Sequence, residues 1–279
     1  MRGTIAPASS STPSPSTSGN YVAHSNLAVA LRDRGDTAAA IPHFQAALEL
    51  RPHDAEAQDN LGEALLRLGQ TDEALGYVTE ALRLNPALPQ GHVNLAAILS
   101  AKGRTNDAAA QYQTALQLNP ANEEAHDGLG AILTDLGRPA EALPQLTEAI
   151  SLKPDDADAH YNLGRLYGLT GRSAEAIGEF SRAVELRPND AQIRFNLGVA
   201  LASEGQLEKA TAEFRLAVDL SPGYANAHAN LGVALAQTGN CAEAVPHFAE
   251  ALRLKPDMEE IRQEMAACRD ASPTSNGNR

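Results

Sequence analysis

The chain has 279 residues, of which 43% are hydrophobic and only 4% aromatic, and its formal net charge is −13 at pH 7. So acidic a protein repels phosphate backbones, and no nucleic-acid partner is expected. No stretch is long enough to span a membrane, and no signal-peptide core is present, so we expect no membrane contact and a cytoplasmic location, although a fragment of an exported protein would read the same way.

Residues 1–20 are rich in serine, threonine and proline and nearly free of large apolar side chains. Such a segment cannot bury enough surface to offset the entropy lost on ordering. We therefore expect a disordered tail.

Residues 21–258 repeat one pattern seven times with a period of 34 residues. A glycine marks the middle of every copy, at Gly35, Gly69, Gly103, Gly137, Gly171, Gly205 and Gly239. A proline marks the end, at Pro52, Pro86, Pro120, Pro154, Pro188, Pro222 and Pro256. A fixed period of this length indicates a solenoid. The predicted repeats are 21–54, 55–88, 89–122, 123–156, 157–190, 191–224 and 225–258.

Each copy is predicted to form two amphipathic helices joined by a tight turn. In the fifth copy, apolar residues recur at intervals of three and four on both sides of Gly171, which is helical spacing. Gly171 is expected to end the first helix with a positive φ. Ser173 is expected to cap the second helix, and Pro188 to stop it. The same capping role is expected of Thr37, Thr71 and Thr105.

Small residues recur at one position of each predicted helix, where we expect the closest packing. The first helix carries Gly62, Gly130, Gly164, Gly198 and Gly232, with Ala28 and Ala96. The second carries Ala47, Ala81, Ala115, Ala149, Ala183, Ala217 and Ala251.

After the last repeat, residues 259–270 are predicted to form a capping helix with one apolar side, followed by a flexible tail at 271–279. Cys268 falls on the apolar side, so it is expected to act as a small buried hydrophobe. Its spacing from Cys241 indicates neither a metal site nor a disulfide framework. No matching cap precedes Tyr21, so self-association through an open N-terminal edge is one possibility, and missing upstream repeats are another.

The pattern resembles the tetratricopeptide repeat family, whose copies read W-x2-L-G-x2-Y, then A-x3-F, A and P. The copy that matches best carries His160, Leu163, Gly164, Tyr167, Ala176, Phe180, Ala183 and Pro188. The chain departs from the family by having no tryptophan, a polar residue standing at that position. The resemblance implies an all-α, right-handed α-solenoid of seven helix-turn-helix repeats plus the capping helix. It also implies a protein–protein interaction scaffold.

One column of asparagines precedes the leucine of each motif: Asn26, Asn60, Asn94, Asn162, Asn196 and Asn230, with Gly128 as a gap. It is similar to the asparagine ladder in the repeats of O-linked N-acetylglucosamine transferase, which implies amides that hold a peptide backbone. An amide offers both donors and an acceptor for this task. The alternative is that these amides only tie neighbouring helices together.

Further residues are expected in the same concave groove. The N-terminal part contributes the acidic Asp59, Glu63 and Asp127, and the C-terminal part contributes Tyr161, Arg165, Phe195, Val199 and Val233. Aromatic residues are enriched where binding energy concentrates. The expected partner is an extended protein segment, basic at one end and apolar at the other.

No catalytic or cofactor motif is found, so we expect neither enzyme activity nor a cofactor. The histidines His24, His92, His126, His160 and His228 share one column, but residues one repeat apart are too distant to share a metal ion, so no metal is expected. The alternative function is a substrate-recruiting arm of a larger enzyme, such as an O-linked glycosyltransferase.

Overall fold

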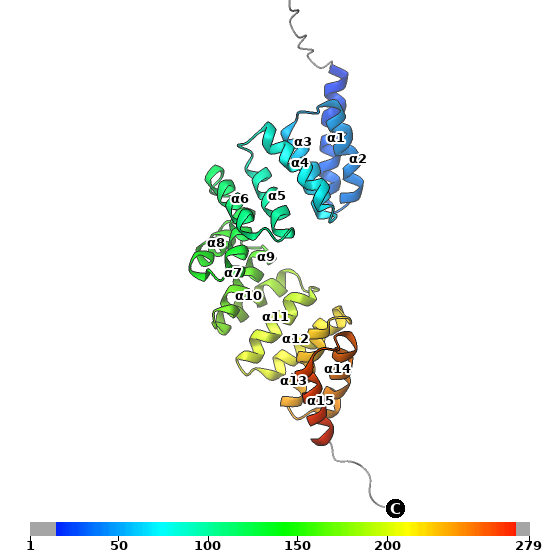
Figure 1. Cartoon of the computed structure of the whole chain (residues 1–279), viewed down its shortest axis with the longest axis vertical. Coiled ribbons are helices and arrows are strands. Elements are labelled where there is room, and N and C mark those ends of the chain that lie inside the picture. The colour runs from blue at the N-terminus through cyan, green and yellow to red at the C-terminus, as the bar shows by residue number, and fades with distance from the viewer. Residues whose placement is uncertain (1–14, 272–279) are drawn as a thin grey trace, which may run out of the picture. The chain divides into compact units, whose positions relative to one another are not determined.

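The computed structural model of the protein describes residues 15–271, which form fifteen α-helices and no β-strand (Figure 1). The first helices of the successive hairpins, called inner helices below, are α1 (Pro15–Asp33), α3 (Ala55–Arg67), α5 (Pro89–Ala101), α7 (Glu123–Asp135), α9 (Ala157–Leu169), α11 (Ala191–Ser203) and α13 (Ala225–Gln237). The second, or outer, helices are α2 (Thr37–Leu50), α4 (Thr71–Leu84), α6 (Thr105–Leu118), α8 (Pro139–Leu152), α10 (Ser173–Leu186), α12 (Leu207–Leu220) and α14 (Cys241–Leu254). The last helix is α15 (Glu259–Ala271).

Helix α1 begins earlier than the composition predicts. Residues 15–20, expected to belong to the disordered tail, form its first turns. Pro15 is the first helical residue, a position where the missing amide hydrogen of proline costs nothing. The rest of the predicted tails, residues 1–14 and 272–279, lies outside the described residues.

The turn between the two helices of each hairpin is set by glycine, as predicted. Gly171 has a φ of 73°, and the other six glycines of its column also have positive φ. The predicted serine and threonine caps are wrong. Ser173 is the first residue of α10, and the residue before it, Arg172, caps the helix without a side-chain hydrogen bond. Side-chain caps occur on inner helices instead: the carboxylate of Asp190 accepts hydrogen bonds from two amides of α11.

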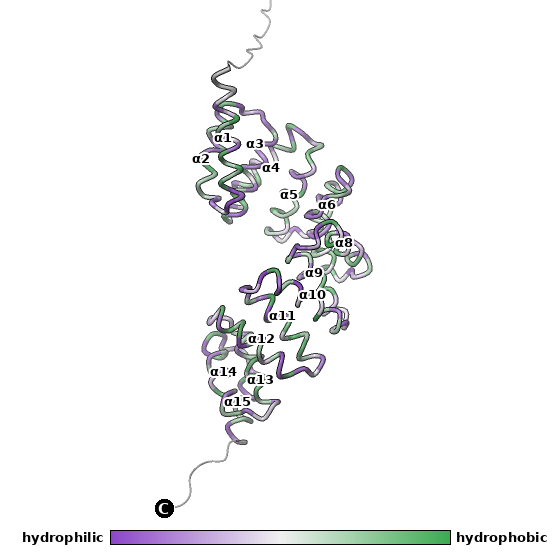
Figure 2. Tube along the Cα trace, turned by 180° about the vertical axis from the view of Figure 1, so that it is seen from behind, coloured by the Kyte–Doolittle hydropathy of each residue, from purple (hydrophilic) through white to green (hydrophobic). Residues whose placement is uncertain are grey.

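Within each hairpin, the glycine column of the inner helix packs against a large side chain of the outer helix. A Cβ added to Gly164 would lie 2.7 Å from Cδ1 of Phe180, and one added to Gly198 would lie 2.6 Å from Cε1 of Phe214. The glycines therefore admit aromatic rings of the same repeat. Apolar and polar residues alternate along the helices, as Figure 2 shows.

The chain divides into two compact units, residues 1–125 and residues 126–279. Inner helices α1, α3 and α5 of the first unit contact their own outer helices, and α3 contacts both of the others; α9, α11 and α13 of the second unit do the same, with α11 in the middle. Outer helices α2, α4, α8, α10 and α12 also contact the inner helix that follows each of them. Phe44, Leu61 and Val78 lie in the core of the first unit, and Phe214 and Phe248 in that of the second. This all-α stacking of hairpins is the arrangement of an α-solenoid, as predicted.

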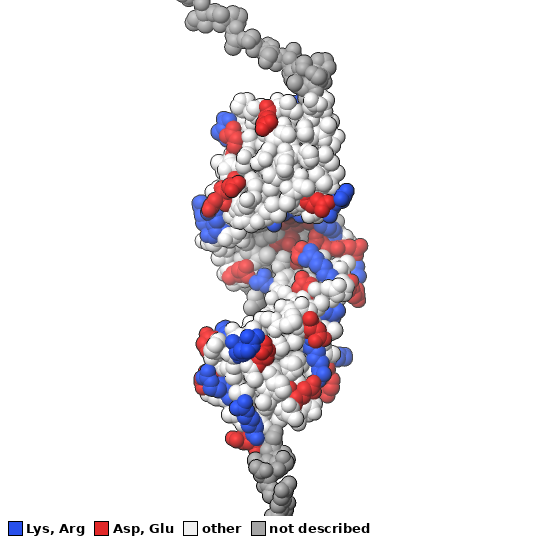
Figure 3. Space-filling model, turned by 90° about the vertical axis from the view of Figure 1, so that its right-hand side faces the viewer, with Lys and Arg blue, Asp and Glu red and all other residues white. Residues whose placement is uncertain are grey.

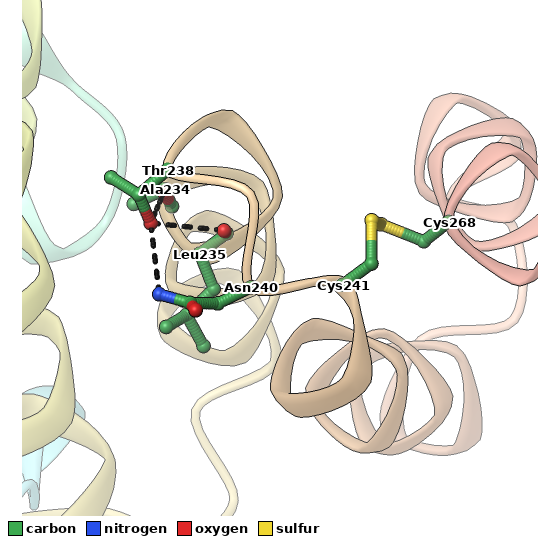
Figure 4. Close-up of a disulfide and its surroundings, with 6 residues drawn as sticks. All are labelled: Ala234, Leu235, Thr238, Asn240, Cys241 and Cys268. Atoms are coloured by element: carbon green, nitrogen blue, oxygen red, sulfur yellow. Dashed lines mark hydrogen bonds between the residues drawn. A yellow bond between two sulfur atoms is a disulfide. The ribbon is translucent and has the colours of Figure 1, made fainter. Parts of the chain in front are cut away.

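Helix α15 closes the stack and is covalently attached to it. Ile261 and Cys268 are buried in the core of the second unit. Cys268 forms a disulfide with Cys241, the first residue of α14 (Figure 4). The cysteine spacing predicted no disulfide, and that prediction is wrong, because α15 packs against α14 and brings together residues 27 positions apart. The prediction that Cys268 is buried is confirmed, with 3% of its surface exposed.

Candidate functional site

A polar clamp stands where the family pattern has tryptophan. In the fifth repeat, Nδ1 of His160 lies 2.7 Å from Oε2 of Glu179 on the outer helix, and its Nε2 lies 2.9 Å from the carbonyl oxygen of Pro154. The same pairing with the residue 19 positions later joins His24 to His43, His92 to Gln111, His126 to Gln145, Arg194 to Glu213 and His228 to His247. His92, His160 and His228 have both ring nitrogens bonded to protein, so the clamp joins these inner helices to their outer partners.

Among the described residues, no group of three or more histidine, cysteine, aspartate or glutamate side chains is placed to hold a metal ion. The histidines of the column each pair within their own repeat.

The asparagine column lies on the side that the inner helices share, called the inner-helix face below. Several of its amides join neighbouring inner helices. Nδ2 of Asn94 donates to Asp59 at 3.0 Å, and Nδ2 of Asn162 donates to Asp127 at 2.9 Å. Nδ2 of Asn196 donates to the Tyr161 hydroxyl at 3.2 Å. Each bond spans 35 residues, so one geometry repeats along the stack.

The other three asparagines are used differently. Asn60 accepts a hydrogen bond from Arg32, and Asn230 donates to the backbone of its own helix. Asn26 is exposed. Three asparagines of the column therefore make the contacts between neighbouring helices that the alternative interpretation predicted. Their amide groups already form hydrogen bonds within the protein in the absence of a partner.

The inner-helix face of the first unit carries a partly neutralised acidic cluster. Glu63 accepts hydrogen bonds from Arg32 at 2.8 Å and from Arg67 at 2.9 Å. Asp59 lies beneath it, with 5% of its surface exposed. Burial raises the pKa of Asp59 to about 6, against the hydrogen bond from Asn94, and Glu63 pushes the same way. A nearby cation stabilises the charged form of such a carboxyl and so lowers its pKa.

The aromatic residues predicted for the groove, Tyr161 and Phe195, are half-buried in the second unit. Their rings pack on the outer-helix aromatics, Tyr161 on Phe180 at 5.9 Å and Phe195 on Phe214 at 5.8 Å between centroids. Tyr224, which the sequence analysis missed, lies 4.9 Å from Phe195. These rings serve the packing of the stack and show only one side to a partner.

The most exposed apolar surface of the second unit surrounds a pocket of about 390 Å³ between α9 and α11, called the central pocket. Its lining includes Arg165, Gly168, Leu169, Phe180, Asn196 and Val199. Leu169 is 70% exposed and Val199 is 40% exposed. Arg165 is held at the rim by Asp135, at 2.6 Å.

Of this pocket, the sequence analysis named Arg165, Asn196 and Val199 but missed Gly168 and Leu169. A signal was available. The positions equivalent to Leu169 in the first, second and fourth repeats hold the charged Asp33, Arg67 and Asp135. A large apolar residue at an exposed position where no other repeat has one indicates a binding surface.

The remaining predicted residue, Val233, lies apart from the central pocket. It lines a second pocket, of about 520 Å³, between α13 and α15. Of the residues predicted for the second unit, Arg165, Asn196 and Val199 line the central pocket, Asn230 and Val233 line the second pocket, and the others line neither. In the space-filling view of Figure 3, acidic and basic side chains are interspersed over the C-terminal part, with no basic patch.

Sequence profiles of the tetratricopeptide repeat family match residues 21–87, 132–191, 170–225 and 217–259, and a further profile described as a TPR repeat matches residues 98–137. The chain belongs to the tetratricopeptide repeat family. No curated protein sequence matches it.

Solved structures show the same fold. The Cut9–Hcn1 hetero-tetramer of the APC/C contains a chain that is 20% identical, with a TM-score of 0.77, covering 86% of this chain and 48% of that one. This chain therefore spans about half the length of that relative. PilF of Pseudomonas aeruginosa is 22% identical, with a TM-score of 0.69 and coverage of 76% and 97%. A MamA structure is 27% identical, with a TM-score of 0.53 and coverage of 60% and 97%.

Proposed function

We propose that the chain is a protein-interaction scaffold that binds an extended protein segment on its inner-helix face. Repeats of this family commonly form non-catalytic surfaces for protein partners. One observation carries the proposal for this chain: Leu169 and Val199 expose apolar surface around the central pocket. Exposed apolar surface that lines a pocket is typical of a binding site.

The acidic cluster of the first unit and the apolar surface of the second support a partner with basic and apolar parts. The acidic cluster of the first unit attracts basic side chains through charge. The apolar surface of the second unit attracts apolar side chains, because burial removes them from water. The asparagines contribute less than the sequence predicted, because Asn94, Asn162 and Asn196 already donate hydrogen bonds within the stack.

The test is a selection from a random-peptide phage library against the full chain, followed by binding measurements on three variants. Leu169→Glu and Val199→Glu place a charge on the proposed surface without opening a cavity, since both side chains are exposed. Leu216→Glu is the matched control, because Leu216 is a 40% exposed leucine on outer helix α12. We expect the first two variants to weaken the selected peptides tenfold or more and the control to leave them unchanged. Loss of binding in the control alone would place the partner on the outer helices.

A second surface favours self-association. Val22 and Leu27 on α1 are 47% and 45% exposed. In later repeats the leucine of this column is covered by the outer helix before it, as Leu61 is, with none of its surface exposed. Leu27→Lys should make the protein monomeric in light scattering over a concentration series, whereas a monomeric parent protein would contradict this proposal.

The disulfide also bears on the proposed location of the chain. No helix among the described residues is long and apolar enough to cross a membrane. Disulfides persist mainly in oxidising compartments. The Cys241–Cys268 bond therefore supports the exported alternative over the cytoplasm. Alkylation of free thiols at the moment of cell lysis tests this, and cysteines that react with the reagent without prior reduction would favour the cytoplasm.

A further inference from the structure

The central pocket is suited to an apolar side chain. Phe180 and Ala200 are buried in its floor, and the polar groups at its rim already have partners. Asn196 donates to Tyr161, and Ser203 donates to Ser173. A polar guest would find these groups occupied, whereas an apolar guest gains by leaving water.

Gly168 lines the pocket and leaves open space there. A Cβ added to Gly168 would meet no atom within 4 Å. The second repeat has Leu66 at this position, and the fourth has Thr134. A partner's side chain can therefore occupy the space that a side chain of the helix fills elsewhere.

The second pocket, called the cap pocket, has a different character. It opens at Ala229, where the two preceding repeats have Tyr161 and Phe195. Its lining includes the apolar Val233, Met258 and Ile261 and the charged Lys255, Asp257, Glu259 and Glu260.

Some carboxylates of the cap pocket are available to pair with a cationic group of a partner. Glu259 forms an ion pair with Arg262. Asp257 and Glu260 form no ion pair with any residue that the structure describes, and only Lys255 offsets them in the lining. An apolar floor below carboxylates fits lysine or arginine, whose aliphatic stem packs on apolar surface while its cation stays at the rim.

The distance between the pockets fixes a spacing along the partner. The central pocket lies between α9 and α11 and the cap pocket between α13 and α15, so they are two inner-helix steps apart. Packed helices lie about 8–10 Å apart, which gives roughly 16–20 Å. An extended chain advances about 3.3–3.6 Å per residue. The span corresponds to about five or six residues.

We propose that the second unit selects an extended segment with a large apolar side chain in the central pocket and a lysine or arginine about five or six residues away in the cap pocket. This specificity rests on the proposed function and deepens it. It goes beyond a general apolar surface by assigning a basic residue to the C-terminal unit, at the capping helix.

The probe is a fluorescein-labelled synthetic peptide of serine and glycine with one leucine and one arginine about six residues apart, titrated with the full chain by fluorescence anisotropy. Two further peptides place the same residues about three and about ten apart. We expect the first to bind at least fivefold more tightly than the others, with a Kd of roughly 0.1–1 mM. Equal affinity for all three spacings would overturn the proposal.

Two variants assign the residues to the pockets. Gly168→Leu fills the central pocket, and its control is Gly178→Leu on outer helix α10, where an added Cβ also meets no atom within 4 Å. Glu260→Lys reverses a charge of the cap pocket, and its control is Glu264→Lys on the same helix, outside the lining. We expect each pocket variant to weaken the probe fivefold or more and each control to leave it unchanged.

The assignment of leucine to the central pocket and of arginine to the cap pocket is tested by also removing each of these residues from the probe. For a probe with serine in place of leucine, Gly168→Leu should have no further effect, and for one with serine in place of arginine, Glu260→Lys should have none. Undiminished effects on the truncated probes would contradict the assignment. If library-selected peptides bind the inner-helix face but lack this pair of residues, the specificity is wrong and the proposed function stands.

Discussion

At the scale of single residues, the surroundings of a residue decide what it does. The glycines show this first, and Asp59 shows it below. Gly171 is required for its positive φ, Gly164 for room beside Phe180, and Gly168 leaves a pocket open. The sequence predicted the first from spacing alone. It also placed Gly164 in a column of close packing, but it gave no role to Gly168, whose surroundings are set only when α9 packs beside α11.

The raised pKa of Asp59 predicts a pH dependence of stability. In the unfolded chain its pKa is near 4, and in the folded protein it is about 6. The folded state therefore holds the proton more tightly, so this contribution is full below pH 4 and is lost as the pH rises to about 6. Asp59→Asn should remove that slope and stabilise the protein at pH 7 by about 1–3 kcal/mol.

Urea unfolding between pH 4 and pH 7 measures the effect. The control is Asp72→Asn, since Asp72 is exposed and its pKa is lowered by the hydrogen bond from Lys102. Parallel pH profiles of the parent and Asp59→Asn would show that the carboxyl does not titrate in this range.

The clamp of the last repeat predicts the opposite dependence. Burial, aided by His228, lowers the pKa of His247 below its usual value near 6.5. The unfolded chain then binds the proton more readily, so stability is lost as the pH falls below about 6.5. His247→Gln should reduce this acid sensitivity, because Gln145 already pairs with His126 in the fourth repeat. Thermal unfolding at pH 7.5 and pH 5.5 tests it, with the exposed His53→Gln as control. An unchanged loss at pH 5.5 would place the acid-sensitive group elsewhere.

At the scale of elements, the helix hairpin could be predicted almost completely and its connections only in part. Proline and glycine spacing located the helices, because those residues act on their own backbone. The disulfide and the asparagine contacts could not be located, since Cys241 with Cys268 and Asn162 with Asp127 meet only after the helices stack. The first turns of α1 were missed because composition alone argued for disorder.

Helix α9 offers a matched pair of substitutions. Gly164→Ala brings a Cβ to 2.7 Å from Phe180 and should destabilise the protein by about 1–3 kcal/mol. Gly168→Ala meets no atom within 4 Å and should stabilise it by about 0.5–1 kcal/mol, because alanine loses less entropy in a helix. Urea unfolding of both variants measures the two changes in unfolding free energy, which should have opposite signs. A stabilising Gly164→Ala would mean that Phe180 moves aside freely.

The capping helix should depend on its disulfide. A crosslink that closes a loop of this length, with 27 positions between the cysteines, stabilises by about 3–4 kcal/mol in the loop-entropy estimate. Cys241→Ser with Cys268→Ser should lower the free energy of unfolding by that amount, lower the unfolding midpoint accordingly and remove its sensitivity to reductant. The parent protein, scanned with and without reductant, is the comparison. If reductant leaves its midpoint unchanged, the bond contributes nothing to stability.

At the scale of the whole molecule, the contacts among the described helices of each unit lie within a hairpin or between neighbouring hairpins, so stability is expected to be a sum of local terms. Gly198→Val forces a branched side chain against Phe214 and weakens the sixth repeat. We expect a broader unfolding transition by circular dichroism and faster amide exchange in and beside that repeat. Gly178→Val, with open space at the added Cβ, serves as control. An equally sharp transition in Gly198→Val would show that the chain unfolds as one cooperative unit.

The disulfide also changes how the protein responds to a pulling force. With the bond intact, the chain between Cys241 and Cys268 cannot lengthen, and the two Cα atoms stay 5.0 Å apart however hard the termini are pulled. At about 3.3–3.6 Å per residue, the shielded segment amounts to roughly 85–95 Å of contour length. A chain stretched between its ends should therefore gain that length in one additional step after reduction, and the C-terminal end of the array is the part that an oxidising environment makes inextensible.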